Sequence, residues 1–122
     1  MAQGKTVILV VDDDAAVRKA WKFSLELDGF AVHACRSGDE LLRHEALSSS
    51  DCIVLDYKMP EMDGLKVLEK LSAAKISAPV IFISGPVSRS LREKALKAGA
   101  RLVLEKPLLD KSLVEKIREV TG

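Results

Sequence analysis

The feature that most constrains the fold is a set of short apolar runs in which nearly every position is hydrophobic. Residues 7–11, 53–55 and 80–83 read VILVV, IVL and VIFI. A strand with one face in water alternates apolar and polar side chains, whereas a strand covered by helices on both faces is apolar throughout. These runs therefore predict a parallel sheet enclosed between two layers of helices.

Amphipathic segments separate the apolar runs, so strand and helix patterns alternate along the whole chain. Strands are predicted at 6–11, 31–35, 51–55, 79–83 and 101–104. Helices are predicted at 15–28, 38–47, 64–74, 87–98 and 110–120. Right-handed crossovers between such strands give an α/β fold, a single doubly wound five-stranded parallel sheet of order 2-1-3-4-5 in a flavodoxin-like (βα)5 sandwich.

Helix starts carry capping signals. Ser37 and Glu40 have the spacing of a capping box, in which a hydroxyl and a carboxylate accept hydrogen bonds from free amides at the helix start. Asp14, Asp63 and Asp110 are predicted N-caps of the first, third and fifth helices.

Composition excludes several classes of protein. The chain has 122 residues, 48% hydrophobic and 30% charged, which suits one soluble domain with a substantial core. Its 19 basic and 18 acidic residues leave a formal charge of +1, which favours neither nucleic acid nor an anionic membrane. The apolar runs are far shorter than the roughly 20 residues of a membrane span, and the first residues lack a signal-peptide pattern. We therefore expect a cytoplasmic protein without a membrane anchor or direct nucleic-acid contact.

The cysteines and histidines do not indicate a metal site. Cys35 and Cys52 lie beside apolar runs without a Cys-x-x-Cys partner and are expected to pack as small buried hydrophobes. His33 and His44 are expected on the surface.

Polar residues follow the predicted strands at the point where each strand ends. Asp12 and Asp13 follow the first strand and Asp56 the third, while Ser84 and Lys106 follow the fourth and fifth. The carboxyl ends of parallel strands meet at one edge of the sheet, where such folds place their working site. We therefore expect these five side chains to lie on one edge.

Three carboxylates at the end of an apolar sheet repel one another, and a hard divalent cation relieves that repulsion. Mg²⁺ takes one or two protein carboxylates together with phosphate oxygens, so an acidic cluster without histidine indicates phosphoryl chemistry more than zinc hydrolysis. One carboxylate would attack phosphorus in line and form an acyl phosphate, with Lys106 and Ser84 binding phosphoryl oxygens. Each residue alone also suits a cap or a turn. Their joint placement at four strand ends favours a phosphate receiver.

Five segments resemble the receiver domain of two-component response regulators. They are 8–14 (ILVVDDD), 54–64 (VLDYKMPEMDG), 81–85 (IFISG), 97–100 (KAGA) and 105–107 (EKP). The resemblance spans essentially residues 1–122, which are expected to form one receiver domain. It implies a signalling switch that catalyses its own phosphorylation and dephosphorylation, and that takes its phosphoryl group from a phosphohistidine of a sensor histidine kinase or phosphotransfer protein, with Mg²⁺ required.

The resemblance also assigns roles. Asp56 is the implied phosphoacceptor, Asp13 a direct metal ligand and Asp12 a second acid acting mainly through water. The main-chain carbonyl of Lys58 is a further implied ligand, so that Asp12, Asp13, Asp56 and Lys58 form the predicted Mg²⁺ site.

The same resemblance describes a switch. Ser84 is the implied switch hydroxyl and Lys106 the phosphate-binding lysine, with a cis Lys106–Pro107 bond. Receivers often carry an aromatic residue at the position of Val103, so the switch is expected to rely on loop and backbone movement more than on a turning ring. Pro86 stiffens the adjoining loop.

Phosphorylation is expected to change the surface formed by the fourth helix, fifth strand and fifth helix. A downstream protein or a second copy would contact this surface, with charged residues Arg92, Lys97, Arg101 and Arg118 available for polar contacts.

Two other functions remain open from the sequence. One is a pseudo-receiver, which keeps the fold but never takes phosphate. The other is a haloacid dehalogenase-like phosphatase, in which Asp12 and Asp14 would form an Asp-x-Asp pair, although this leaves Asp56 unexplained. The sequence does not decide between a stand-alone receiver and a fragment of a larger regulator.

Overall fold

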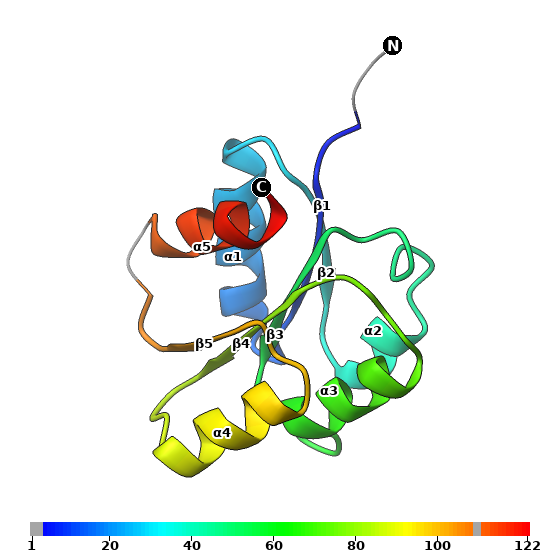
Figure 1. Cartoon of the computed structure of the whole chain (residues 1–122). Coiled ribbons are helices and arrows are strands. Elements are labelled where there is room, and N and C mark those ends of the chain that lie inside the picture. Colours follow the sequence, from blue (N-terminus) through cyan, green and yellow to red (C-terminus); the bar gives the residue numbers. More distant parts are fainter. Residues whose placement is uncertain (1–3, 109–110) are drawn as a thin grey trace.

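The computed structural model describes residues 4–108 and 111–122. Its core is a five-stranded parallel sheet of order β2-β1-β3-β4-β5, as the sequence predicted (Figure 1). The strands are β1 (Val7–Val11), β2 (Ala31–Cys35), β3 (Cys52–Asp56), β4 (Val80–Ser84) and β5 (Leu102–Glu105). The helices are α1 (Ala15–Leu27), α2 (Gly38–Leu42), α3 (Gly64–Ala73), α4 (Arg89–Lys97) and α5 (Ser112–Thr121).

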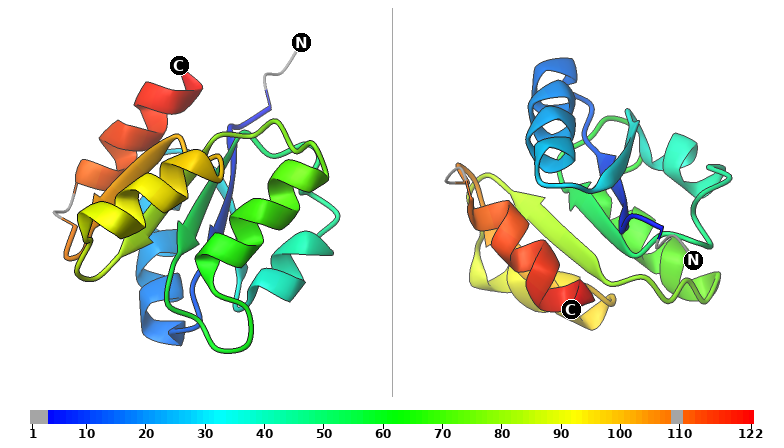
Figure 2. Two further views of the ribbon diagram at one scale, coloured as in Figure 1. Left: turned by 60° about the horizontal axis from the view of Figure 1, so that its bottom comes forward. Right: turned by 90° about the horizontal axis from the view of Figure 1, so that it is seen from above.

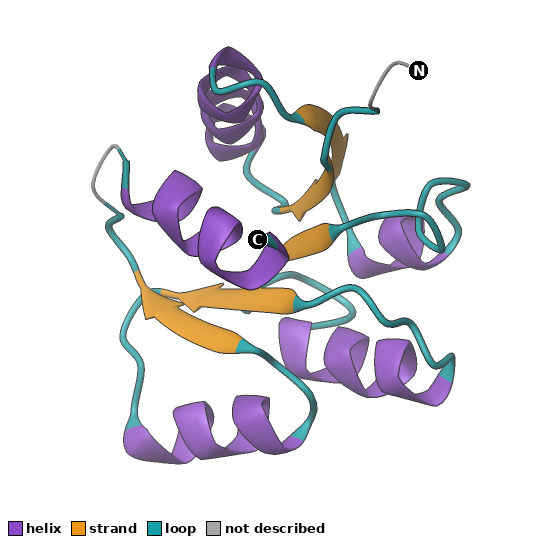
Figure 3. Ribbon diagram, turned by 45° about the horizontal axis from the view of Figure 1, so that its top comes forward, coloured by secondary structure: helices purple, strands orange, loops and turns teal. Residues whose placement is uncertain are grey.

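The helices form two layers on opposite faces of the sheet (Figures 2 and 3). Helices α1 and α5 cover one face, where their buried side chains pack against Ile8 and Val10 of β1. Helices α2, α3 and α4 cover the other face, against Leu9 and Val11 of the same strand. Because all four of these β1 residues are fully buried, the strand shows no polar alternation. The non-alternating runs thus identified the sheet correctly.

Most predicted caps are present. Asp14 Oδ1 accepts hydrogen bonds from the amides of Ala16 (2.9 Å) and Val17 (3.3 Å) at the start of α1. Asp63 Oδ1 accepts from the Lys66 amide (3.0 Å) at the start of α3. These bonds satisfy amides that the helix itself leaves free.

The capping box of α2 differs slightly from the predicted form. Ser37 Oγ accepts from the Glu40 amide (3.0 Å), as expected. The Glu40 carboxylate accepts from the amide of Arg36 (2.6 Å), the residue before the cap. Asp110, the predicted cap of the fifth helix, lies outside the described residues; α5 begins at Ser112, with Lys111 at the cap position and no side-chain cap bond.

The predicted second helix was too long. Helix α2 ends at Leu42, and turns at 43 and 45–49 replace the helix expected to reach 47. His44 Nδ1 accepts the Ala46 amide (3.0 Å), and Ser50 Oγ donates to the Leu47 carbonyl (2.8 Å). Such local side-chain bonds compete with helical ones.

The cysteines are buried as expected, and burial raises the pKa of both the Cys35 and Cys52 thiols to about 12. His33 is exposed and His44 half-buried. Within 4–108 and 111–122, none of the helices has the length and apolar character needed to cross a membrane.

Candidate functional site

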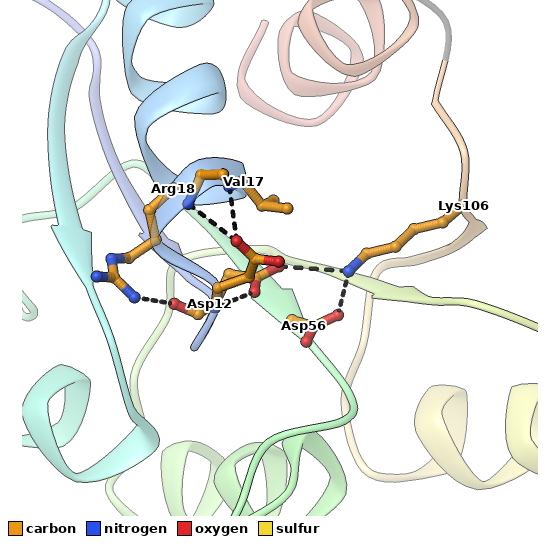
Figure 4. A network of polar contacts seen from close by, with 7 residues as sticks. Asp12, Val17, Arg18, Asp56 and Lys106 are labelled. Carbon is orange, nitrogen blue, oxygen red and sulfur yellow. Dashed lines mark hydrogen bonds and ion pairs between the residues drawn. The ribbon is translucent and has the colours of Figure 1, made fainter.

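The carboxyl ends of β1, β3 and β5 bring two acids and a lysine into direct contact (Figure 4). Lys106 Nζ lies 2.9 Å from Asp56 Oδ1 and 3.3 Å from Asp12 Oδ2. Asp12 and Asp56 are 1% and 3% exposed, whereas Asp13 is exposed. One carboxylate oxygen of each acid lies within 4.8 Å of the others, and Asp12, Asp13 and Asp56 are here named the acidic cluster.

Main-chain pairing fixes each of these positions. The Asp12 amide donates to the Cys35 carbonyl (3.1 Å), and the amide after Asp56, that of Tyr57, donates to the Ile83 carbonyl (2.8 Å). The Lys106 amide donates to the Ser84 carbonyl (2.7 Å). The sheet therefore sets the backbone at every strand end before any side chain contributes.

Both oxygens of Asp12 have partners. Its Oδ1 accepts from the Asp14 amide (2.8 Å), and its Oδ2 accepts from Lys106 Nζ. Arg18 Nη1 donates to the Asp12 main-chain carbonyl (2.8 Å), so α1 holds the end of β1 (Figure 4). The sequence pattern did not identify Arg18, because helical periodicity gives its face but not the carbonyl it reaches.

Asp56 is less well satisfied. Within the described part of the chain, its buried Oδ1 has the charge of Lys106 beside it but no aligned hydrogen-bond donor. Burial raises the pKa of Asp56, the charges of Asp12 and Asp13 raise it further, and Lys106 opposes them. Burial alone would lower the pKa of Lys106, but its contacts with Asp56 and Asp12 outweigh burial and raise it.

The donor set fits a hard cation. All three members of the acidic cluster offer carboxylate oxygens, and Asp56 presents an oxygen without a hydrogen bond. Ligand sets made only of oxygen suit Mg²⁺ or Ca²⁺, whereas Zn²⁺ sites in proteins typically include nitrogen or sulfur ligands. The residues present therefore suit the divalent ion expected from the sequence.

Ser84 ends β4 beside this cluster. It is 4% exposed, and its Oγ donates to the Pro86 carbonyl at 3.4 Å, within its own loop. An open cavity of about 440 Å³ adjoins it, with walls from 57–59, Asp63 and 84–86. Lys58 lies in this wall, two residues beyond Asp56, and its side chain is exposed.

Gly64 was part of the recognised motif, but the sequence did not show its purpose. A Cβ there would lie 2.7 Å from the Asp56 carbonyl oxygen and 2.9 Å from the Phe82 ring. The Gly64 amide donates to the Tyr57 carbonyl (2.8 Å). Glycine thus lets α3 begin against the end of β3, which closes the loop around the site.

The structure also places the other residues that the sequence analysis named. The Lys106–Pro107 bond is cis, as expected. Val103 is buried, and Arg92 Nη1 donates to its carbonyl (3.1 Å), while Arg118 lies 4.0 Å from Asp28. Arg92, Lys97, Arg101 and Arg118 are all exposed.

Comparison with known proteins shows the family to which the chain belongs. The family model of the response regulator receiver domain matches residues 8–118, so the chain belongs to this family of two-component signalling domains. It is 38% identical over 111 residues to the response regulator MprA of Mycobacterium leprae, covering 91% of this chain and 49% of that protein. The chain thus spans about half the length of the curated relatives it matches.

Solved structures agree as well. A response regulator receiver domain protein from Clostridium thermocellum superposes with a TM-score of 0.88 at 31% identity, over 95% of this chain and 94% of that one. A CheY-like receiver domain protein from Methanospirillum hungatei gives 0.86 at 30% identity, over 95% and 93% of the two chains.

Proposed function

We propose that this receiver domain, taken as residues 1–122, is a switch that accepts a phosphoryl group on Asp56 from a sensor histidine kinase or phosphotransfer protein. The observation that carries this proposal is the buried Asp56 oxygen that has the Lys106 ammonium beside it but no hydrogen-bond donor. An oxygen so placed is available as a nucleophile, and the ammonium is close enough to stabilise the negative charge of the incoming phosphoryl group.

Mg²⁺ would be held by Asp12, Asp13, Asp56 and the main-chain carbonyl of Lys58. When bound, it would neutralise the acidic cluster and the phosphate oxygens, which is the main electrostatic demand of phosphoryl transfer. Asp13 is exposed and therefore accessible to an ion that keeps several of its waters.

The chain's own residues supply the rest of the transfer. An electron pair of the Asp56 carboxylate forms the new P–O bond while the P–N bond of the donor phosphohistidine breaks. The imidazole leaves with the electron pair of that bond. Lys106, already between Asp12 and Asp56, moves its ammonium to a phosphoryl oxygen. Water later attacks phosphorus, the P–O bond to Asp56 breaks, inorganic phosphate leaves and Asp56 is again a free carboxylate.

Ser84 would convert this chemistry into movement. Its hydroxyl now bonds weakly to the Pro86 carbonyl, and a phosphoryl oxygen is a better, charged acceptor. If Ser84 turns toward Asp56, the β4–α4 loop follows and the α4–β5–α5 surface changes. A downstream protein or a second copy would read that surface.

The alternatives are less well supported. A phosphatase of the Asp-x-Asp type needs the Asp14 carboxylate, but Asp14 Oδ1 is bonded to the Ala16 and Val17 amides as the cap of α1. A pseudo-receiver typically lacks an acid or the lysine, whereas here Asp12, Asp56 and Lys106 form one ion-paired group.

Intact-mass spectrometry after incubation with acetyl phosphate and Mg²⁺ tests the proposal. The parent should gain one phosphoryl group, and Asp56→Asn should gain none. Asp51→Asn is the matched control, because Asp51 directly precedes the same strand at its opposite end and binds the Val7 amide (2.7 Å). Undiminished labelling of Asp56→Asn, or an unlabelled parent, contradicts the proposal, and rapid turnover of acetyl phosphate without a stable label favours the phosphatase.

The metal is tested separately. Asp13→Ala should bind Mg²⁺ weakly and lose the Mg²⁺ dependence of its residual labelling. Labelling of the parent that proceeds equally well in EDTA would contradict the assignment of Mg²⁺ to the acidic cluster.

A further inference from the structure

The indole of Trp21 lies beside the lysine of the site. Trp21 is the only tryptophan in the chain and sits on α1, half-buried against the apolar cluster that includes Ile8 and Val10. Its ring centroid is 5.9 Å from Lys106 Nζ. The ammonium therefore lies near carboxylates that follow β1 and β3 and near an aromatic ring of α1.

The two kinds of contact act differently on the lysine. Asp12 accepts a hydrogen bond from the ammonium and Asp56 attracts it by charge, so the two carboxylates hold it in the unphosphorylated position. An aromatic face attracts a cation within about 6 Å without accepting a directed hydrogen bond. The ammonium can therefore keep its contact with Trp21 while its N–H groups turn from the Asp56 carboxylate to a phosphoryl oxygen.

Lys106 also needs such guidance. Lysine carries its charge on a flexible four-carbon stem, and much of its conformational freedom must be lost for the ammonium to meet one oxygen. The Lys106 amide is fixed by the Ser84 carbonyl (2.7 Å), and the side chain is 33% exposed. A wall contributed by α1 limits the directions that this exposed stem can take.

We propose that Trp21 is a positioning residue for phosphoryl transfer, which keeps the Lys106 ammonium over the acidic cluster and directs it to the phosphoryl group on Asp56. This inference rests on the proposed function and adds a residue of α1 to it.

A double-mutant cycle tests the coupling. The initial rate of acetyl phosphate labelling is measured for the parent, Trp21→Leu, Lys106→Met and the double variant. Trp21→Leu should slow labelling about threefold to fivefold, the size expected for one partly exposed cation–π contact. In the Lys106→Met background the same substitution should change the rate by less than about 1.5-fold. Trp21→Phe, which keeps an aromatic face, should stay within about twofold of the parent.

Each outcome discriminates. If the parent is labelled but Trp21→Leu matches it, or slows labelling equally in both backgrounds, the inference is wrong while the proposed function stands. If the parent is never labelled, the proposed function fails and this inference with it.

Fluorescence gives a test that needs neither phosphorylation nor a folded Trp21 variant. Because Trp21 is the only tryptophan, its emission reports on this one environment. Lys106→Met should shift the emission maximum, whereas Lys70→Met, an exposed lysine on α3, should not. Identical spectra for the parent and Lys106→Met would overturn the placement of the ammonium beside the ring.

Discussion

The acidic cluster and the β4–α4 loop lie at the same edge of the sheet but are held very differently. Asp12 has partners on both carboxylate oxygens, and Asp56 is ion-paired at 2.9 Å. The loop is held without an ion pair: Ser84 Oγ donates to the Pro86 carbonyl at 3.4 Å, and the Val87 amide donates to Glu105 Oε1 at 3.2 Å. The side chains of the cluster are therefore held in place, whereas the loop can exchange its hydrogen-bond partners at a small cost in free energy.

The acidic cluster and the β4–α4 loop also differ in the charge that they bury. The cluster concentrates two buried carboxylates around one lysine, so removing any one charge changes the balance strongly. The loop contacts involve one buried but neutral hydroxyl and one exposed carboxylate, so losing either leaves no buried charge without a partner. Substitutions should therefore have large effects in the cluster and small ones in the loop.

The largest effect should come from Lys106→Met, which removes the one cation that is ion-paired with the Asp12 and Asp56 carboxylates in the described residues. Labelling by acetyl phosphate should slow by about a hundredfold to a thousandfold, as for loss of one electrostatic contact to a reacting group. The free energy of unfolding should fall by about 1–2 kcal/mol in EDTA, less than for a fully buried pair because the lysine is partly exposed. Urea unfolding of this variant and the exposed control Lys70→Met measures the difference; equal losses would contradict the described balance.

The next largest effect should be a gain in the free energy of unfolding. Asp56→Asn removes a buried carboxylate whose pKa is raised by burial and by Asp12 and Asp13, so this variant should be more stable than the parent at pH 7 in EDTA, by about 1–2 kcal/mol. A raised pKa means that the folded parent binds a proton more readily than the unfolded chain, so the parent regains stability as pH falls through the folded pKa.

The advantage of Asp56→Asn should therefore shrink with acidification and vanish below the ordinary pKa of aspartate. Thermal unfolding from neutral to acidic pH measures it, with Asp51→Asn as control. An advantage that grows as pH falls would contradict the direction of the shift.

The sequence predicts the positions of the strand ends better than the contacts of individual side chains. Strand ends follow from apolar runs and parallel pairing, so the convergence of Asp12, Asp56 and Lys106 was predictable from backbone topology alone. The roles of Trp21 and Glu105 were not, because they depend on where side chains of α1 and β5 point after packing. Periodicity places a residue on a helix face but does not identify its partner across the sheet.

The main error in the predicted fold, the length of the second helix, comes from side-chain hydrogen bonds that compete with helical ones. Residues 38–47 carry a helical pattern, but helix α2 stops at Leu42, where the side chains of His44 and Ser50 form turn hydrogen bonds. Helix propensity and a side-chain hydrogen bond each contribute about 1 kcal/mol, so propensity alone does not decide between helix and turn.

Ser84→Ala tests whether the loop carries the readout. Labelling of Asp56 should persist within about tenfold of the parent, because the hydroxyl is one neutral donor among several contacts. The phosphorylation-dependent shifts of amide resonances in α4 and β5 should shrink by at least about half.

Two variants serve as controls for Ser84→Ala. Ser84→Thr keeps the hydroxyl and should respond like the parent. Val103→Ala should alter the response little, because an aliphatic residue has no ring to turn inward. A full response in Ser84→Ala, or none in Val103→Ala, would contradict a readout through the loop.

The smallest effect should come from Glu105, whose Oε1 accepts the Val87 amide and so ties the loop to β5. Both residues are at least partly exposed, so Glu105→Ala should change the free energy of unfolding by less than about 0.5 kcal/mol. The local effect should still be visible, because the Val87 amide proton loses a charged acceptor and its resonance should move upfield. Glu105→Gln keeps an acceptor oxygen and should move it less. If the two variants shift Val87 equally, Glu105 does not hold the loop. If either destabilises the whole domain, the loop is more firmly bound to the sheet than these two hydrogen bonds imply.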